Sequence, residues 1–132
     1  MGLNLYDTTF FVDLDREKRQ GRKGPAWQFL EAHPDDEMAM SVITWGELAR
    51  GFDDRAEWEA FGSGFLVYPL GDGILWQAAV VFNQLREQGL PIADNDLWIA
   101  ATALRHGLAL VSDNARHFDR IKGLQVVAYR SA

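Results

Sequence analysis

The 132-residue sequence contains no cysteine, only four prolines and no long hydrophobic run. The absence of cysteine excludes disulfide bonds, thiolate metal sites, iron–sulfur clusters and cysteine nucleophiles. The longest stretch without a charged side chain runs from Gly73 to Leu85, well short of the ~20 apolar residues that a membrane span needs. The N-terminus has neither a basic start nor a long apolar run, so no signal peptide is expected. These absences predict a soluble, cytoplasmic protein with no membrane contact.

Several catalytic and nucleotide-binding motifs are missing as well. There is no GxGxxG and no GxxxxGK[ST] segment, which argues against dinucleotide and P-loop sites. The serines lack the GxSxG pattern of a hydrolase nucleophile. The histidines His33, His106 and His117 show neither HExxH nor HxxxH spacing, so a zinc site is not expected. Arg116 and His117 could face the edge of a cleft, but we interpret them as solvated surface residues.

What the chain does contain is an ordinary globular composition with an uneven charge distribution. Hydrophobic residues make up 48% and charged residues 24%, which at this length predicts a single domain over residues 1–132. The net charge is −6, yet the segment Arg16–Lys23 (REKRQGRK) carries +4 and leaves −10 for the remainder. A solvated loop is one interpretation of this segment, and a phosphate-binding patch is the other.

Short apolar runs alternate with helical patterns along the chain. Strands are expected at residues 3–6, 38–41, 65–70, 108–111 and 124–129. Helices are expected after Gly24-Pro25, around residues 43–52, at 74–85, from Asp96 to Gly107 and at 114–120. This alternation predicts a three-layer α/β/α domain built on a mostly parallel, about five-stranded sheet.

Oxygen-bearing side chains follow the predicted strands. Asp7 comes directly after the first strand, Glu47 lies in the helix after the second, and Asp113 and Asn114 follow the fourth, while Asp96 starts the helix that leads into the fourth strand. Ligands bind at the carboxyl ends of strands in open parallel sheets, so we expect these side chains to meet at one edge. A cluster of carboxylates needs a cation, and all-oxygen ligands favour Mg²⁺ or Mn²⁺ over zinc.

Helix capping is the alternative explanation for each acid. Asp7 would cap the turn after its strand, Thr44 and Glu47 match a capping box, and Asp96 is a natural N-cap. Ser112 or Asp113 would cap the next helix in the same way. Capping does not explain why all the acids fall at one end of the expected sheet.

Four segments of the chain resemble the PIN-domain ribonucleases, and among them the VapC-type toxins of bacterial toxin–antitoxin modules. They are LYDTTFFVDL at 5–14, SVITWGELARG at 41–51, PIADNDLWIAATALRHGLALVSDNARHF at 91–118 and GLQVVAY at 123–129. The ordered set and its spacing are more specific than any one motif, and together the segments span nearly the whole chain.

The resemblance implies a role for particular residues. Asp7, Glu47, Asp96 and Asn114 correspond to the catalytic positions of the family; Asp7 and Asp96 bind the metal, with Glu47 and Asp113 as further candidate ligands. Asn114 stands where many relatives have Asp, which leaves open one metal or two, and Asp113 or Asp94 could supply the missing carboxylate. Thr9 stands where members often have Asn. Thr8 or Ser112 would order the ligand shell.

The resemblance also implies an activity and partners. It implies an Mg²⁺- or Mn²⁺-dependent endoribonuclease acting on structured RNA of the tRNA or ribosomal RNA class, a homodimer, and inhibition by a cognate antitoxin protein. The natural RNA-phosphate contacts would be the basic residues of the charged segment, Arg16, Lys18, Arg19, Arg22 and Lys23. The aromatic residues Trp27, Phe29, Trp45, Trp58 and Phe61 would form a groove for a helix of the antitoxin. The competing hypothesis is a catalytically silent PIN-like module that binds RNA or an antitoxin.

Overall fold

The structure is a computed structural model that describes residues 2–130, in which strands and helices alternate. The strands are β1 (Leu3–Tyr6), β2 (Glu37–Ser41), β3 (Leu66–Tyr68), β4 (Leu110–Ser112) and β5 (Val126–Ala128). The helices are α1 (Thr8–Gln20), α2 (Pro25–Ala32), α3 (Val42–Ala49), α4 (Arg55–Gly62), α5 (Asp72–Glu87), α6 (Asp94–His106) and α7 (Ala115–Phe118).

The five strands form one sheet in the order β3-β2-β1-β4-β5, and every neighbouring pair is parallel. The predicted α/β class and strand number are therefore confirmed. Because β1 lies in the middle of the sheet, Asp7, the residue after it, lies at the centre of the carboxyl edge. The same edge receives the residues after β2 and β4.

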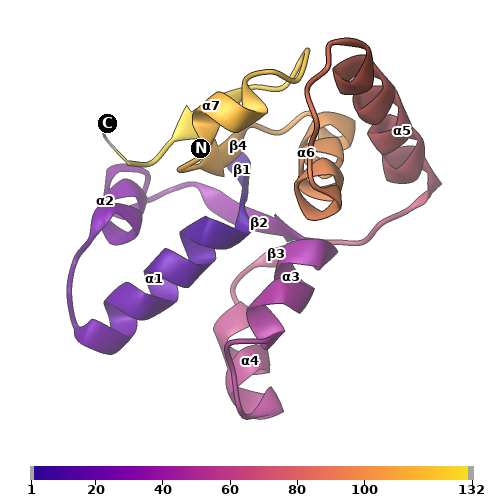
Figure 1. Cartoon of the computed structure of the whole chain (residues 1–132). Helices are drawn as coiled ribbons and strands as arrows, with labels where there is room; N and C mark the ends of the chain where they lie inside the picture. Colours follow the sequence, from indigo (N-terminus) through magenta and orange to yellow (C-terminus); the bar gives the residue numbers. More distant parts are fainter. Residues whose placement is uncertain (1, 131–132) are drawn as a thin grey trace.

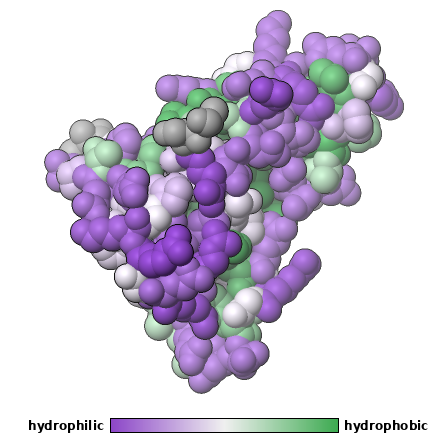
Figure 2. All heavy atoms as spheres, turned by 60° about the vertical axis from the view of Figure 1, so that its left-hand side comes forward, coloured by the Kyte–Doolittle hydropathy of each residue, from purple (hydrophilic) through white to green (hydrophobic). Residues whose placement is uncertain are grey.

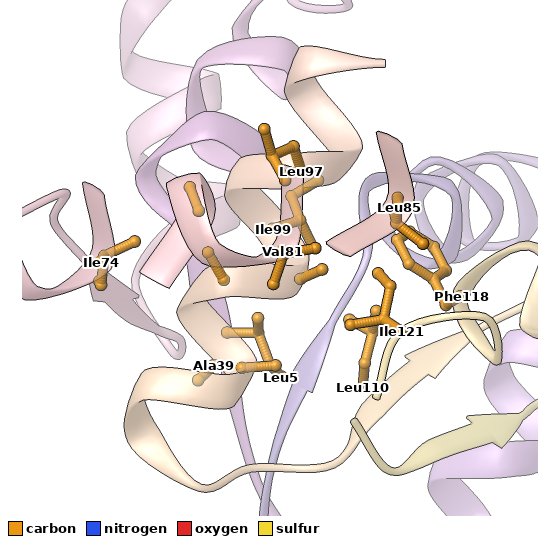
Figure 3. Packing of buried hydrophobic residues seen from close by; sticks show 14 residues of the cluster. Leu5, Ala39, Ile74, Val81, Leu85, Leu97, Ile99, Leu110, Phe118 and Ile121 are labelled. Carbon is orange, nitrogen blue, oxygen red and sulfur yellow. The ribbon is translucent and has the colours of Figure 1, made fainter. Parts of the chain in front are cut away.

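Helices cover both faces of the sheet, with α1 and α2 on one side and α5 and α6 on the other (Figure 1). Successive strand residues point to opposite faces, so Leu5 joins the hydrophobic cluster beneath α5 and α6, while Tyr6 joins the cluster beneath α1 and α2. Figure 3 shows the first cluster, where Val81 and Ile99 from the two helices pack above Leu5 of the sheet. The rigid double-sided core fixes the carboxyl edge that carries the candidate site.

The charged segment is a loop only from Gly21 to Lys23, so the loop interpretation was wrong for its first five residues. Its residues from Arg16 to Gln20 form the last turns of α1, which ends at Gly21 with a positive φ of 64°. Phe10, Phe11 and Leu14 anchor this helix in the core. Helix α4 was also not expected, because its apolar face is short and consists of Trp58 and Phe61, neither of which is fully buried.

The remaining expected elements are present with shifted boundaries. The helix expected from Asp96 begins two residues earlier, at Asp94, and the fourth and fifth strands are shorter than their apolar runs. Gly107 ends α6 in the left-handed conformation, as its position predicts. None of the helices in the described residues is long and apolar enough to span a membrane.

Candidate active site

Asp7 is a buried carboxylate at the centre of the carboxyl edge, with 5% of its surface exposed. Its Oδ1 accepts a hydrogen bond from the Phe10 backbone N–H at 3.0 Å, and its Oδ2 accepts one from the Ser112 hydroxyl at 2.5 Å. The pKa of Asp7 is nevertheless raised to about 6, mainly by burial and to a smaller extent by the negative charges of Asp113 and Asp96. Within residues 2–130, no Lys, Arg or His lies within ion-pair distance of this carboxylate.

Glu47 reaches the same edge from α3 and is held on both of its oxygens. The Thr8 hydroxyl donates to Oε1 at 2.6 Å, and the Asn95 side-chain amide donates to Oε2 at 3.0 Å. Thr8 also lies 3.0 Å from the Thr44 hydroxyl; since its single proton goes to Glu47, Thr44 is the donor of that contact. Residues from α1, α3 and α6 thus fix one carboxylate.

Asp96 lies in the first turn of α6 and faces His117. Its Oδ2 is 3.4 Å from His117 Nε2, a buried nitrogen that makes no hydrogen bond among the described residues. Arg120 Nη2 lies 3.1 Å from His117 Nδ1, and because an arginine only donates, the neutral ring carries its proton on Nε2, toward Asp96. Burial raises the pKa of Asp96, His117 lowers it, and the charge of Glu47 raises it.

The loop after β4 contributes the fourth candidate position. The Asn114 backbone N–H donates to the Ser112 hydroxyl at 2.9 Å, so Ser112 links this loop to Asp7. The Asn114 side chain is exposed and makes no capping hydrogen bond to α7. Asp113 lies near enough to raise the pKa of Asp7, and its Oδ2 is 3.9 Å from Arg130 Nε.

The capping explanation holds for Asp7 alone. Asp7 is the N-cap of α1, so this residue both caps a helix and carries a buried charge. The capping-box interpretation of Thr44 and Glu47 was wrong, because the N-cap of α3 is Ser41 and Thr44 lies inside the helix. Asp96 is not an N-cap either, since α6 begins at Asp94.

The carboxylate oxygens of the site are ligands that suit a hard divalent cation, although the acids that carry them are spread apart. Within residues 2–130, no group of three His, Asp or Glu side chains lies close enough to hold a metal ion as placed. Each acid instead contacts its own hydroxyl, amide or imidazole partner. The buried, uncompensated charge of Asp7 is the observation that fits a cation, because a buried carboxylate without a counter-charge is costly.

The basic segment lies away from these carboxylates. Helix α1 starts at the site with Thr8, and Arg19 lies about 16 Å farther along the helix axis at 1.5 Å per residue. Lys18 and Arg19 point toward aromatic rings, 5.7 Å from Phe61 and 5.6 Å from Phe52. Arg16 is the member of the segment nearest to the site.

Sequence reasoning missed Asn95, and it favoured a solvated surface position for His117 over a place at the edge of the site. The Asn95 side chain donates a hydrogen bond to Glu47, which lies 48 positions earlier in the sequence, and nothing in the residues around Asn95 indicates this contact. His117 is not a solvated surface residue, because its side chain is three-quarters buried beside Asp96. Its one signal is its position three residues after Asn114.

Comparisons with known proteins agree with this architecture. The family model described as "PIN domain" matches residues 5–124. A protein of Rickettsia felis named "Ribonuclease VapC1" is 37% identical over an alignment that covers 99% of this chain and 98% of the relative. The "Ribonuclease VapC1" of Haemophilus influenzae (strain R2866) is 34% identical and covers 70% of this chain and 74% of the relative.

Solved structures show the same fold. The VapBC-1 structure from nontypeable Haemophilus influenzae superposes with a TM-score of 0.78 at 29% identity and covers 98% of both chains. The DNA-bound VapBC structure from Salmonella typhimurium gives a TM-score of 0.82 at 23% identity, covering 98% of this chain and 100% of the other, and supports the fold alone.

Proposed function

The chain belongs to the PIN-domain family, and from this premise we propose that it is a metal-dependent endoribonuclease toxin neutralised by a cognate antitoxin. The observation that carries the proposal is the position of Asp7, Glu47 and Asp96 along one sheet edge, where the charge of Asp96 raises the pKa of Asp7 and the charge of Glu47 raises that of Asp96. The relatives named ribonuclease support the activity, and the neighbouring VapBC structures support the antitoxin partner. We place the protein in the cytoplasm.

We assign the metal site to Asp7 and Asp96, with Glu47 and Asp113 as outer members and Mg²⁺ or Mn²⁺ as the ion. When bound, such an ion supplies an activated water and stabilises the charge that develops on a phosphodiester. The ion also neutralises a cluster of acids that would otherwise repel RNA phosphates.

The chain's own residues orient this set. Ser112 and the Phe10 backbone hold the Asp7 carboxylate in one orientation, and Thr8 and Asn95 do the same for Glu47. We assign to the exposed Asn114 amide the orientation of a water at the edge of the site. The substrate is an RNA phosphodiester of the tRNA or ribosomal RNA class, with the basic segment of α1 as a candidate phosphate contact.

Calorimetric titration of Mn²⁺ tests the site without knowledge of the RNA target. We expect saturable binding to the wild type and at least about 100-fold weaker binding to Asp7→Asn/Asp96→Asn, because both direct ligands lose their charge. Asp53→Asn, which removes an exposed acid after α3, should bind like the wild type. Equal affinity in the wild type and the double variant would contradict the assignment.

A catalytically silent binding module is the second candidate function. Two observations favour it: Asn114 lacks a charge, and no three acids converge within residues 2–130. The module would bind its partner equally well in EDTA and in Mg²⁺. Cleavage of cellular RNA that requires Mg²⁺ and stops on addition of chelator would exclude it.

We assign the antitoxin contact to the surface between α1–α2 and α3–α4. Figure 2 shows this side of the molecule, where hydrophobic surface appears between hydrophilic regions. Trp45 and Trp58 stack at 4.2 Å on one flank, and Trp27 lines a surface cavity of about 410 Å³ on the other. Phe29 is less available, because it packs into the core and stacks on His33.

Co-expression tests the antitoxin proposal. We expect the product of the adjacent upstream reading frame to co-purify with the wild-type protein. Trp58→Ala should weaken the complex by about tenfold or more, as is typical of an interfacial tryptophan. Failure of the wild-type pair to co-purify would count against this partner.

We assign the homodimer contact to helix α5, whose outer face carries exposed apolar side chains. They are Leu75, Trp76, Val80 and Phe82, and Trp76 is 73% exposed. An apolar row of this kind fits burial against a second copy. Light scattering should show a dimer for the wild type and a monomer for Trp76→Glu, whereas a dimeric variant would place the contact elsewhere.

A further inference from the structure

A second cluster of charged side chains lies beside the carboxylate site and has a different composition. Its centre is Asp13, a residue of α1 that is only 3% exposed. Asp13 Oδ1 accepts from Arg16 Nη2 at 2.5 Å, and Oδ2 accepts from the Tyr129 hydroxyl at 2.6 Å and from Arg130 Nη2 at 2.7 Å. One buried carboxylate therefore anchors two arginines, one from α1 and one from the segment after β5.

The arginines have donors to spare. Their side chains are 52% and 40% exposed, so both guanidinium groups face solvent while their positions are fixed from below. Each guanidinium has five N–H donors in a planar fork, and Asp13 uses one nitrogen of each. The cluster carries one negative and two positive charges, the opposite balance to the acidic body of the protein.

The cluster also has a defined place relative to the carboxylates. Ser112 pairs with Ala128 across β4 and β5, which brings Arg130 alongside Asp113. Arg130 Nε lies 3.9 Å from Asp113 Oδ2, and the charge of Asp113 raises the pKa of Asp7 more than the charge of Asp96 does. The arginine pair thus borders the carboxyl edge on its β5 side, while Glu47 borders it on the β2 side.

We propose that Arg16 and Arg130, anchored by Asp13, form a phosphate-binding pair that holds an RNA phosphate next to the one that is cut. This inference rests on the proposed ribonuclease function and adds the direction in which the RNA strand leaves the site. A cation held by the carboxylates would neutralise the phosphate bound there, but the neighbouring phosphates of the strand need a counter-charge from protein side chains. Arginine forks match phosphate geometry, and this pair is held in place before RNA binds.

The proposal separates Arg16 from the rest of the basic segment. Lys18 and Arg19 turn toward the rings of Phe61 and Phe52 on the other flank of α1, and Arg19 is paired with Asp15 at 2.8 Å. Arg16 instead turns toward the C-terminal segment and Arg130. The positive charges of α1 therefore lie on two different surfaces, one beside Phe52 and Phe61 and the other beside Arg130.

Nuclear magnetic resonance of the arginine Nε–Hε groups tests the pair directly. The protein is kept in EDTA, which prevents metal-dependent cleavage, and titrated with a short oligouridylate at low salt. We expect the Nε–Hε signals of Arg16 and Arg130, assigned with Arg16→Gln and Arg130→Gln, to shift saturably. The signal of Arg55, which forms a similar ion pair with Glu59 on α4, should not move.

Fluorescence anisotropy with the labelled oligouridylate gives the second readout. Arg16→Gln/Arg130→Gln should bind about tenfold more weakly and lower the slope of log K against log salt by about 1.4, since each lost contact with a single strand accounts for about 0.7. Arg16→Lys/Arg130→Lys keeps the charges and should keep most of the slope. Arg55→Gln is the matched control and should behave like the wild type.

Two results would overturn the pair: unmoved Arg16 and Arg130 signals, or an unchanged salt slope in a folded double Gln variant. Either result would assign the cluster a structural role. The proposed function fails separately. Signals that shift in a protein that never cleaves RNA would refute the nuclease and keep the pair, whereas cleavage with unmoved signals would refute only the pair.

Discussion

Replacing Asp7 with asparagine is expected to abolish RNA cleavage and, at the same time, to stabilise the metal-free protein at neutral pH. Cleavage should fall about 100-fold or more, because the central metal ligand loses its charge. Asparagine keeps both contacts of Asp7, since its carbonyl can accept from the Phe10 N–H and its amide can donate to Ser112. The uncompensated buried charge is what the substitution removes.

The size and the pH window of the stabilisation follow from the Asp7 pKa. It is about 6 in the folded protein against 3.8 for an ordinary Asp, a difference worth about 3 kcal/mol at most. The folded state binds the proton more tightly, so this contribution to stability is complete below pH 3.8, falls as the pH rises toward 6, and is absent above it. We therefore expect Asp7→Asn to raise the free energy of unfolding at pH 7 by about 1–3 kcal/mol.

Denaturant unfolding in EDTA between pH 4 and 7 measures this effect. The wild type should lose stability relative to Asp7→Asn across this range, and saturating Mn²⁺ should restore it in the wild type alone. Asp53→Asn, which removes an exposed carboxylate, should show no such difference. An Asp7→Asn protein that is less stable than the wild type at pH 7 in EDTA would show that the Asp7 charge is compensated in a way that these contacts do not include.

Asp13→Ala is expected to be the most destabilising single substitution of a charged residue. It leaves the buried Tyr129 hydroxyl and two guanidinium groups without their shared acceptor. The two arginines stay partly solvated, but leaving the buried Tyr129 hydroxyl without its acceptor costs about 1–3 kcal/mol, a noticeable part of the about 5–15 kcal/mol that stabilises a typical domain. Loss of the contact would also release the segment after β5 from α1.

The same helix provides the control for this prediction. Asp15 pairs with Arg19 at 2.8 Å in an i,i+4 contact on the surface, so Asp15→Ala should cost less than about 1 kcal/mol. Asp13→Asn should fall between the two, because its carbonyl can still accept one hydrogen bond. Urea unfolding of the three variants gives the comparison. Equal losses for Asp13→Ala and Asp15→Ala would mean that the Asp13 cluster contributes no more than a surface pair.

The sequence predicted helix boundaries best at residues whose backbone can adopt few conformations or that are typical of one position in a helix. Gly107 at the end of α6 and Pro25 at the start of α2 marked boundaries that the structure confirms, because few conformations suit these residues. The apolar runs predicted all five strands. Helix α1 was missed because its buried face includes two acids, Asp13 and Glu17, so its pattern is not that of an apolar stripe.

The sequence predicted the sheet edge at which the site lies, but not the hydrogen bonds that orient the side chains of the site. Parallel strands must bring the residues after β1 and β4 to one edge, so the positions of Asp7 and Asn114 follow from topology. The contact of Asn95 with Glu47 depends on the turn at which α6 begins, and a shift of two residues in that start changes which side chains face the site. Arg130 could not be found, since its neighbours Asp13 and Asp113 are distant in sequence.

The central place of β1 has a consequence for synthesis of the protein. Asp7 is synthesised well before Ser112, the residue whose hydroxyl orients it, because Ser112 follows 105 positions later in the chain. At about 5–20 residues per second, the two are separated by roughly 5–20 s of translation. A nascent chain that has not yet added β4 holds Asp7, Glu47 and Asp96 without the strand that organises them. The parallel topology thus delays assembly of the edge until almost all of the described chain has been made, which gives a partner time to arrive.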